Sequence, residues 1–270
     1  MELPILAPSS APAAHRQFVI DALPILRSDS RIVGVAAAGS WADDSMDEHS
    51  DVDLVIAVRS CAFDEVMVDR ELIASAMGNL VAGFTGEHVG EPRVLICLFA
   101  SPLLHVDLKF VDVEQVGGVV DRPVVLWQRQ EFGEALARSF TGYPTPDKAW
   151  LEQRFWTWIH YGAAKVLRGE LFEAIDLITF LRGRVLGPLI LEAVGATPVG
   201  VRRLEIAAPD WARRLEGTVA SYSSDSCFRA LGVCAESYRE LRPPQGRAAS
   251  RAEQAAMSFL SNAERSGRTT

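Results

Sequence analysis

The spacing of apolar positions predicts a first half of the chain that mixes strands and helices. Two apolar runs, residues 32–38 and 52–58, are typical of buried strands. Two further runs, residues 93–99 and 104–111, flank the short segment 100–103, and this arrangement predicts a β-hairpin. We therefore expect a sheet in this half.

Two helices are expected beside these strands. One covers residues 14–26, where Pro24 is expected to kink or shorten it. The other covers residues 63–80, and the apolar residues on roughly one side of it are Val66, Leu72, Ile73, Ala76 and Leu80. Strands and helices together predict a domain of the α/β or α+β class that ends between residues 120 and 146.

The second half has a helical pattern throughout. Asp147 is a suitable N-cap for a helix that runs to residue 168, and Gly169 is placed to end it. Further helices are expected at these ranges: 171–193, 209–215, 226–241 and 247–263. We therefore predict two domains, a sheet domain at residues 1–145 and a helical bundle at residues 146–270.

Charge and cysteine content narrow the choice of partners. The formal net charge is −8, which counts against nucleic acid, because clustered Lys and Arg hold phosphate backbones. It suits a cationic small molecule, and it also simply keeps a protein in solution. The four cysteines lack metal-ligand spacing, so idle thiols in a reducing compartment are expected: Cys61, Cys97, Cys227 and Cys234.

No segment of the sequence reads as a membrane or export signal. The N-terminus lacks a basic region followed by a long apolar stretch. The longest apolar run, residues 185–194, contains Gly187, Pro188 and Glu192 and is too short to span a bilayer. We expect a cytoplasmic protein with no membrane partner.

Three carboxylates carry the candidate chemistry. The strand at residues 32–38 leads into Gly39-Ser40, and Asp51-Val52-Asp53 opens the next strand after ten intervening residues. Residues two apart on a strand face the same side, so Asp51 and Asp53 project together with Cα atoms about 6 to 7 Å apart. Asp107 lies on the polar face of a later strand, between His105 and Lys109. That stripe suits an active-site wall, although any half-exposed strand shows the same alternation.

Electrostatics favours a metal at such a cluster. Two carboxylates 4 Å apart repel by about 4 kcal/mol at an effective dielectric near 20. Divalent cations remove this cost, and oxygen-only ligands suit Mg²⁺ or Mn²⁺. Two such ions can orient the attacking and leaving oxygens of an in-line displacement at phosphorus. Gly39 permits close backbone approach, and the Ser40 hydroxyl and backbone N–H groups are suited to triphosphate oxygens.

These residues form one motif, which consists of Gly39-Ser40, a ten-residue gap, Asp51-Val52-Asp53 and the later Asp107. The motif resembles the signature of the DNA polymerase beta-like nucleotidyltransferase superfamily. The resemblance implies an α+β fold with a small mixed sheet, and two Mg²⁺ ions. It implies that Gly39 and Ser40 bind the nucleotide's phosphates and that Asp51 and Asp53 ligate both metals. Asp107 would ligate the catalytic metal and help to deprotonate the acceptor. Many relatives have a basic residue after Gly-Ser, where this chain has an acidic loop (Asp43, Asp44, Asp47 and Glu48). A solvated loop or a contact with a polycationic acceptor would explain it.

A sheet domain followed by a helical domain is similar to the aminoglycoside and lincosamide antibiotic nucleotidyltransferases. By this similarity Lys165 is a candidate for reaching the triphosphate, against the alternative of a surface lysine. Three aromatic residues, Trp156, Trp158 and Tyr161, would form a substrate wall or part of the core.

The leading hypothesis is an ATP-dependent adenylyltransferase acting on a hydroxyl of a small molecule, such as an aminoglycoside or lincosamide. The alternatives are a nucleotidyltransferase that modifies a protein or a tRNA end, and a noncatalytic nucleotide-binding module. The sequence does not decide the acceptor, the preferred nucleotide, the general base or the oligomeric state.

Overall fold

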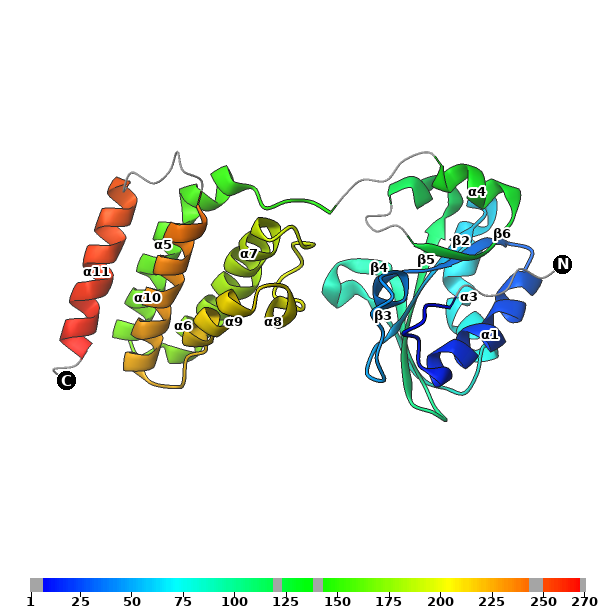
Figure 1. Ribbon diagram of the computed structural model, residues 1–270, viewed down its shortest axis with the longest axis horizontal. Helices are drawn as coiled ribbons and strands as arrows, with labels where there is room; N and C mark the ends of the chain where they lie inside the picture. Colours follow the sequence, from blue (N-terminus) through cyan, green and yellow to red (C-terminus); the bar gives the residue numbers. More distant parts are fainter. Residues whose placement is uncertain (1–6, 119–122, 138–142, 243–249, 268–270) are drawn as a thin grey trace. The chain divides into compact units, whose positions relative to one another are not determined.

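The computed structural model describes residues 7–118, 123–137, 143–242 and 250–267. The chain divides into two compact units, Met1–Gly142 and Tyr143–Thr270 (Figure 1). The first combines a sheet with helices, and the described residues of the second are helical with no strand. The predicted α+β class is confirmed.

One mixed sheet of six strands organises the first unit, in the order β3-β4-β5-β2-β1-β6. Strands β2 and β5 run parallel, and the other neighbouring pairs are antiparallel. The strands are β1 (Ile32–Ala37), β2 (Val52–Val58), β3 (Leu80–Gly86), β4 (Glu91–Phe99), β5 (Leu104–Asp112) and β6 (Val124–Gln128). The strands expected at β1, β2, β4 and β5 are confirmed, as is the β4–β5 hairpin, whereas β3 and β6 were not predicted.

Both helix predictions in this unit need correction at their ends. Helix α1 (Ala13–Ser28) continues past Pro24, so the expected shortening is wrong. Burial of Leu23 and Leu26 outweighs the hydrogen bond that proline removes. Helix α3 (Phe63–Ala76) ends four residues early, because the following residues pair with β4 as strand β3. Its buried residues are Val66 and Ala74, and the supposed core residue Leu72 is 73% exposed.

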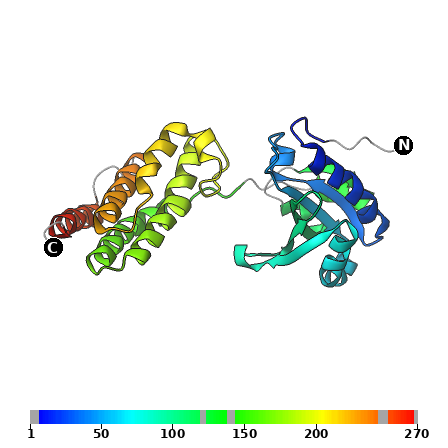
Figure 2. The same cartoon turned by 90° about the horizontal axis from the view of Figure 1, so that it is seen from below.

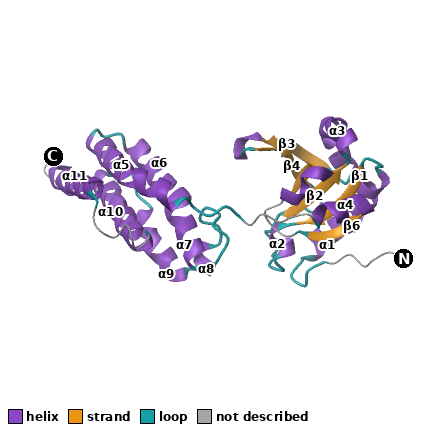
Figure 3. Cartoon of the chain, turned by 90° about the horizontal axis from the view of Figure 1, so that it is seen from above, coloured by secondary structure: helices purple, strands orange, loops and turns teal. Residues whose placement is uncertain are grey.

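Helices cover both faces of the sheet (Figures 2 and 3). Helices α1 and α3 lie over one face, whose core includes Leu54, Ile56 and Leu108. Helix α4 (Gln130–Leu136) and the 3-10 helix η3 (Val113–Gly118) lie over the other, whose core includes Val55, Val111 and Phe132. Alternation along the strands places Asp53 and Asp107 on this second face. The short elements are α2 (Gly39–Ala42), η1 (Ser60–Ala62) and η2 (Glu87–Val89).

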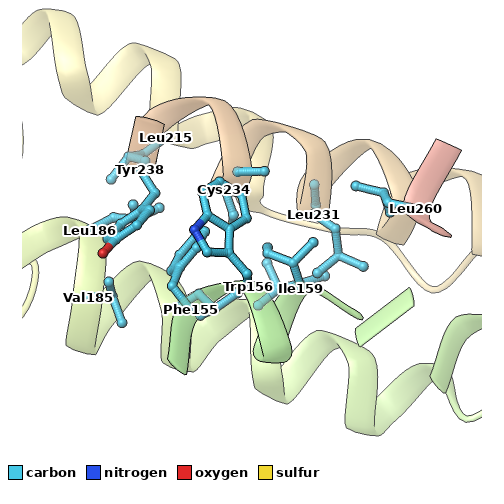
Figure 4. Close-up of a cluster of buried hydrophobic side chains, with 14 of the residues drawn as sticks. Phe155, Trp156, Ile159, Val185, Leu186, Leu215, Leu231, Cys234, Tyr238 and Leu260 are labelled. Atoms are coloured by element: carbon cyan, nitrogen blue, oxygen red, sulfur yellow. The ribbon is translucent and has the colours of Figure 1, made fainter. Parts of the chain in front are cut away.

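The second unit is a helical bundle with its own core (Figure 4). Its elements are α5 (Lys148–Leu167), α6 (Leu171–Phe180), the π-helical η4 (Leu181–Leu186), α7 (Gly187–Ala193), α8 (Leu204–Ala207), α9 (Pro209–Leu215), the 3-10 helix η5 (Glu216–Thr218), α10 (Ser224–Leu241) and α11 (Arg251–Gly267). Asp147 caps α5 as predicted, accepting a hydrogen bond from the Trp150 backbone N–H. The start of the expected helix 247–263 lies partly outside the described residues. Among the described helices, none combines the length and apolar character needed to cross a membrane.

Two of the three residues of the expected aromatic wall, Trp156 and Trp158, lie in or against that core, whereas Tyr161 is 41% exposed. The Phe155 ring stacks on Tyr238 with centroids 3.8 Å apart. Trp156 is 2% exposed and donates its indole N–H to Glu152. Trp158 packs edge-on against Phe180. These contacts support the core interpretation for Trp156, which is stabilised by burial and a single hydrogen-bond partner.

Candidate metal and nucleotide site

The parallel pairing of β2 and β5 brings the three predicted carboxylates together. Asp53 is the register partner of Asp107, and paired residues of neighbouring strands face the same side of a sheet. Asp51 precedes β2 by one residue and completes the group. One carboxylate oxygen from each of the three residues lies within 4.8 Å of the other two.

Burial of the alternate positions holds these carboxylates on one face. Val52 and Leu54 on β2, and Val106 and Leu108 on β5, are at most 1% exposed in the core beneath α1 and α3. Turning either strand over would bury charge and expose this core. The three carboxylates themselves are half-buried.

The neighbours of Asp107 along β5 supply two further polar groups. His105 Nε2 lies 3.0 Å from Asp107 Oδ1. Lys109 Nζ lies 3.0 Å from Glu91 Oε2, and Arg93 holds the same Glu91 carboxylate at 2.7 Å. Hydrogen bonding by Arg93, with a further contribution from Lys109, lowers the pKa of Glu91 to about 2. Glu91 therefore neutralises the lysine that shares a strand face with Asp107.

Gly39 is fitted closely against Asp53. Its φ is +56°, and a Cβ built there would lie 2.2 Å from Asp53 Oδ2. The Ala38 backbone N–H donates to the Asp53 carbonyl oxygen at 3.0 Å. Only glycine satisfies both the left-handed backbone and the close approach. The predicted phosphate-binding turn and a predicted metal ligand are thus in direct contact.

The side chain of Ser40 has an unsatisfied hydroxyl. Its Oγ is buried and has no hydrogen-bond partner within the part of the chain that the structure describes. The surrounding turn is held by backbone bonds, from Asp43 N–H to the Gly39 carbonyl and from Ser45 N–H to the Ser40 carbonyl. An orphaned buried hydroxyl is destabilising unless a ligand satisfies it.

Two carboxylates of the acidic loop are bonded within the chain. Asp44 accepts hydrogen bonds from the Ser10 backbone N–H and the Ser9 hydroxyl, and these bonds lower its pKa. Asp47 accepts from the His49 backbone N–H and the Ser50 hydroxyl. These contacts favour a structural loop over a surface for a polycationic acceptor.

Sequence reasoning missed a buried histidine beside the site. His15 on α1 is 3% exposed, and its Nε2 lies 2.7 Å from the Ser50 carbonyl oxygen. Ser50 directly precedes Asp51, so α1 helps to fix the start of β2. An isolated histidine on a predicted helix carries no signal for such a contact.

Lys165 lies in the helical unit, on α5. Its ammonium group is 2.6 Å from Glu170 and 3.2 Å from Glu173, and it lies 5.0 Å from the centre of the Tyr161 ring. The bond to Glu170, followed by those to Glu173 and Tyr161, raises the pKa of Lys165. A role for Lys165 at a triphosphate stays a prediction.

The donor set at the three aspartates fits a hard divalent cation. Carboxylate oxygens are the ligands that Mg²⁺ prefers, and a cation removes the repulsion between them. The Cys97 thiol does not compete, because it lies on the opposite face of the sheet, in the core that also contains Val106. Burial there, with the charge of Asp107 adding to it, raises its pKa to about 12. Asp51, Asp53 and Asp107 are therefore suitable residues to hold magnesium.

Comparison with protein-family profiles and with curated proteins gives no match to this chain. Eight chains of solved structures are similar to it, and two of them are named as follows. One is an aminoglycoside 6-adenyltransferase from Bacillus subtilis, at 15% identity and a TM-score of 0.33, covering 93% of this chain and 96% of that one. The other is a nucleotidyltransferase-like protein from Exiguobacterium sibiricum 255-15, at 14% identity and a TM-score of 0.34, covering 91% and 78%.

Proposed function

We propose that this protein is a magnesium-dependent nucleotidyltransferase that moves a nucleoside monophosphate, AMP from ATP in the leading case, onto a hydroxyl of a small molecule. The observation that carries the proposal is the in-register pairing of Asp53 with Asp107, next to Asp51 and in contact with the Gly39 turn. Carboxylates for a metal and a turn for phosphates thus occupy neighbouring positions.

Each group has a defined part in this chemistry. Asp51 and Asp53 would hold two Mg²⁺ ions, and Asp107 would hold the ion nearer the acceptor. The ions supply charge neutralisation and orientation for displacement at phosphorus. The Gly39 turn allows the phosphate chain to approach the backbone, and the unsatisfied Ser40 hydroxyl donates to a phosphate oxygen.

The reaction is a single displacement. The acceptor oxygen forms a bond to the α-phosphorus, and the bond from that phosphorus to the oxygen bridging to the β-phosphate breaks. Pyrophosphate leaves with that oxygen, and the acceptor proton passes to solvent by way of Asp107. Positioning and electrostatic stabilisation supply most of the rate enhancement in such a site.

The charge pattern supports a small acceptor over a tRNA end, because the net charge is −8 and phosphate backbones require clustered cations.

A noncatalytic module is disfavoured for a different reason. Three carboxylates within 4.8 Å repel one another, and a protein without a metal gains nothing from keeping them together.

The test is product analysis on the full-length protein. We would incubate it with Mg²⁺, each nucleoside triphosphate in turn, and a panel of aminoglycosides and lincosamides, and record mass spectra. A nucleotide-sized adduct on one compound, lost with EDTA and in Asp53→Asn, supports the proposal. A parallel incubation with tRNA in place of the antibiotics tests the RNA alternative, and an adduct found only on tRNA or only on the protein moves the target to that class. Absence of any metal-dependent pyrophosphate release contradicts the proposed function.

A further inference from the structure

The site face of the sheet continues from the carboxylates onto an apolar surface. Asp53 pairs with Asp107, Asp107 with Ile96 on β4, and Ile96 with Phe84 on β3. Residues paired in this way share one face, so these four side chains form a row across four strands. With strands about 4.8 Å apart, Phe84 lies roughly 10 Å from Asp107.

The outer end of this row is open to solvent. Phe84 is 53% exposed and makes a tilted ring contact with His88 at 5.7 Å. Ile96 is half-buried. Helix α4 and η3 pack on this face over β1, β2 and β5, toward the other edge of the sheet. An exposed aromatic ring in line with a catalytic cluster is a candidate binding surface.

The geometry of in-line displacement indicates which of the two substrates binds to this surface. The attacking oxygen and the leaving pyrophosphate lie on opposite sides of the α-phosphorus. The turn proposed for the phosphates follows β1 and contacts Asp53, so the leaving side is the β1 side. The entering side is then the side of Asp107, which continues to β4 and β3.

We propose that the acceptor binds along Ile96 and Phe84, and that Phe84 selects acceptors with an apolar or aromatic face beside the reactive hydroxyl. This inference rests on the proposed function.

The charge of the surface supports the same class of acceptor. The carboxylate of Glu91, beside this row, is occupied by Arg93 and Lys109. A polycation would need several uncommitted carboxylates on the wall, so a neutral or weakly charged ring compound fits it better.

The experiment compares two acceptors that differ only in the aglycone, 4-nitrophenyl β-D-glucoside and methyl β-D-glucoside. The full-length protein, with Mg²⁺ and ATP, is assayed for nucleotidylated sugar, and kcat/KM is measured for each. We expect the aryl glucoside to be preferred roughly three- to tenfold, the size of one aromatic stacking contact. Phe84→Ala should abolish that preference and leave the KM for ATP unchanged, whereas Phe84→Tyr should retain it.

The matched control is Leu72→Ala. Leu72 is also a large exposed apolar residue, 73% exposed, but it lies on α3 over the opposite face, so the preference should persist. Equal use of the two glucosides by the wild-type protein, transfer to neither, or a preference that survives in Phe84→Ala would overturn the inference. Metal-dependent release of pyrophosphate without an added acceptor distinguishes failure of the acceptor surface from failure of the proposed function. If release occurs, only the acceptor surface is wrong, and if it does not, the proposed function itself fails.

Discussion

The backbone of Gly39 and the carboxylate of Asp53 are so close that a Cβ at position 39 would lie 2.2 Å from Asp53 Oδ2. The turn proposed to bind phosphates and the strand proposed to bind metal are therefore coupled, both by this close approach and by the hydrogen bond from the Ala38 N–H to the Asp53 carbonyl oxygen. A side chain at position 39 cannot be accommodated unless Asp53 moves.

Gly39→Ala should lower activity by about 100-fold or more, because a displacement of about 1 Å at reacting groups has effects of that size. Its left-handed φ of +56° adds a backbone cost of roughly 1–2 kcal/mol. The measurement is kcat/KM for the nucleotide. Gly90→Ala is the control, since Gly90 has a φ of +77° and a Cβ there meets nothing within 4 Å. It should lose similar stability and keep its activity, and equal activity in both variants would refute the coupling.

Asp51→Asn and Asp53→Asn should each lower kcat/KM about a thousandfold, or about 4 kcal/mol of transition-state stabilisation. The free energy of unfolding of the metal-free protein should stay the same or rise, because a repulsive charge is removed. Asp112→Asn on β5 is the matched control, since Asp112 bonds Ser60 Oγ and the Glu114 backbone N–H. It should spare catalysis and change stability little, because the asparagine Oδ1 still accepts both bonds. Near-normal activity in both site variants would show that neither residue holds a required metal.

Ser40→Ala should raise the KM for the nucleoside triphosphate about tenfold, as expected for one lost hydrogen bond to a charged group. Stability should be unchanged or slightly higher, because the Ser40 hydroxyl is buried without a partner within the described part of the protein. Thermal unfolding and steady-state kinetics give the two quantities. Ser60→Ala should show the reverse pattern, since its hydroxyl donates to Asp112 at 2.6 Å. A loss of stability in Ser40→Ala with no change in KM would contradict the phosphate role.

Glu91 should make stability depend on acid pH. Its pKa is lowered from 4.5 to about 2, first by Arg93 and then by Lys109. The stabilisation is fully present above about pH 4.5 and is lost as the pH falls toward 2. Glu91→Gln should therefore unfold at a lower temperature than wild type at neutral pH, and the gap should close in this window. In a protein that already carries Arg93→Met, replacing Glu91 by Gln should lower the unfolding temperature less. A difference between wild type and Glu91→Gln that does not change with pH would contradict the ion pairing proposed for Glu91.

The strands that hold the carboxylates were predictable from sequence, β2 as an apolar run interrupted only by Asp53, and β5 from its alternation of apolar and polar residues. Burial of Val52 and Leu54 fixes the orientation of Asp53, and burial of Val106 and Leu108 fixes that of Asp107. Their adjacency was not predictable from alternation. It depends on β2 pairing in parallel with β5 across more than forty residues of intervening chain, and local patterns carry no information about such pairing.

Strand β3 was missed for an identifiable reason. Residues 80–86 contain two glycines and expose Val81 and Phe84, so they lack the alternation that marks a half-buried strand. Hydrogen bonding to β4 makes this segment a strand, and edge position explains its exposure. The acceptor surface proposed at Phe84 therefore could not be inferred from the sequence.

The most direct test of the account is to locate the metal. Crystals of the protein grown with Mn²⁺ and a non-hydrolysable ATP analogue would be measured at a wavelength where manganese scatters anomalously. We expect an anomalous peak bounded by Asp51, Asp53 and Asp107, at about 2.0–2.3 Å from the carboxylate oxygens, with the triphosphate at Gly39 and Ser40. A bound nucleotide with no peak among these three carboxylates would contradict it.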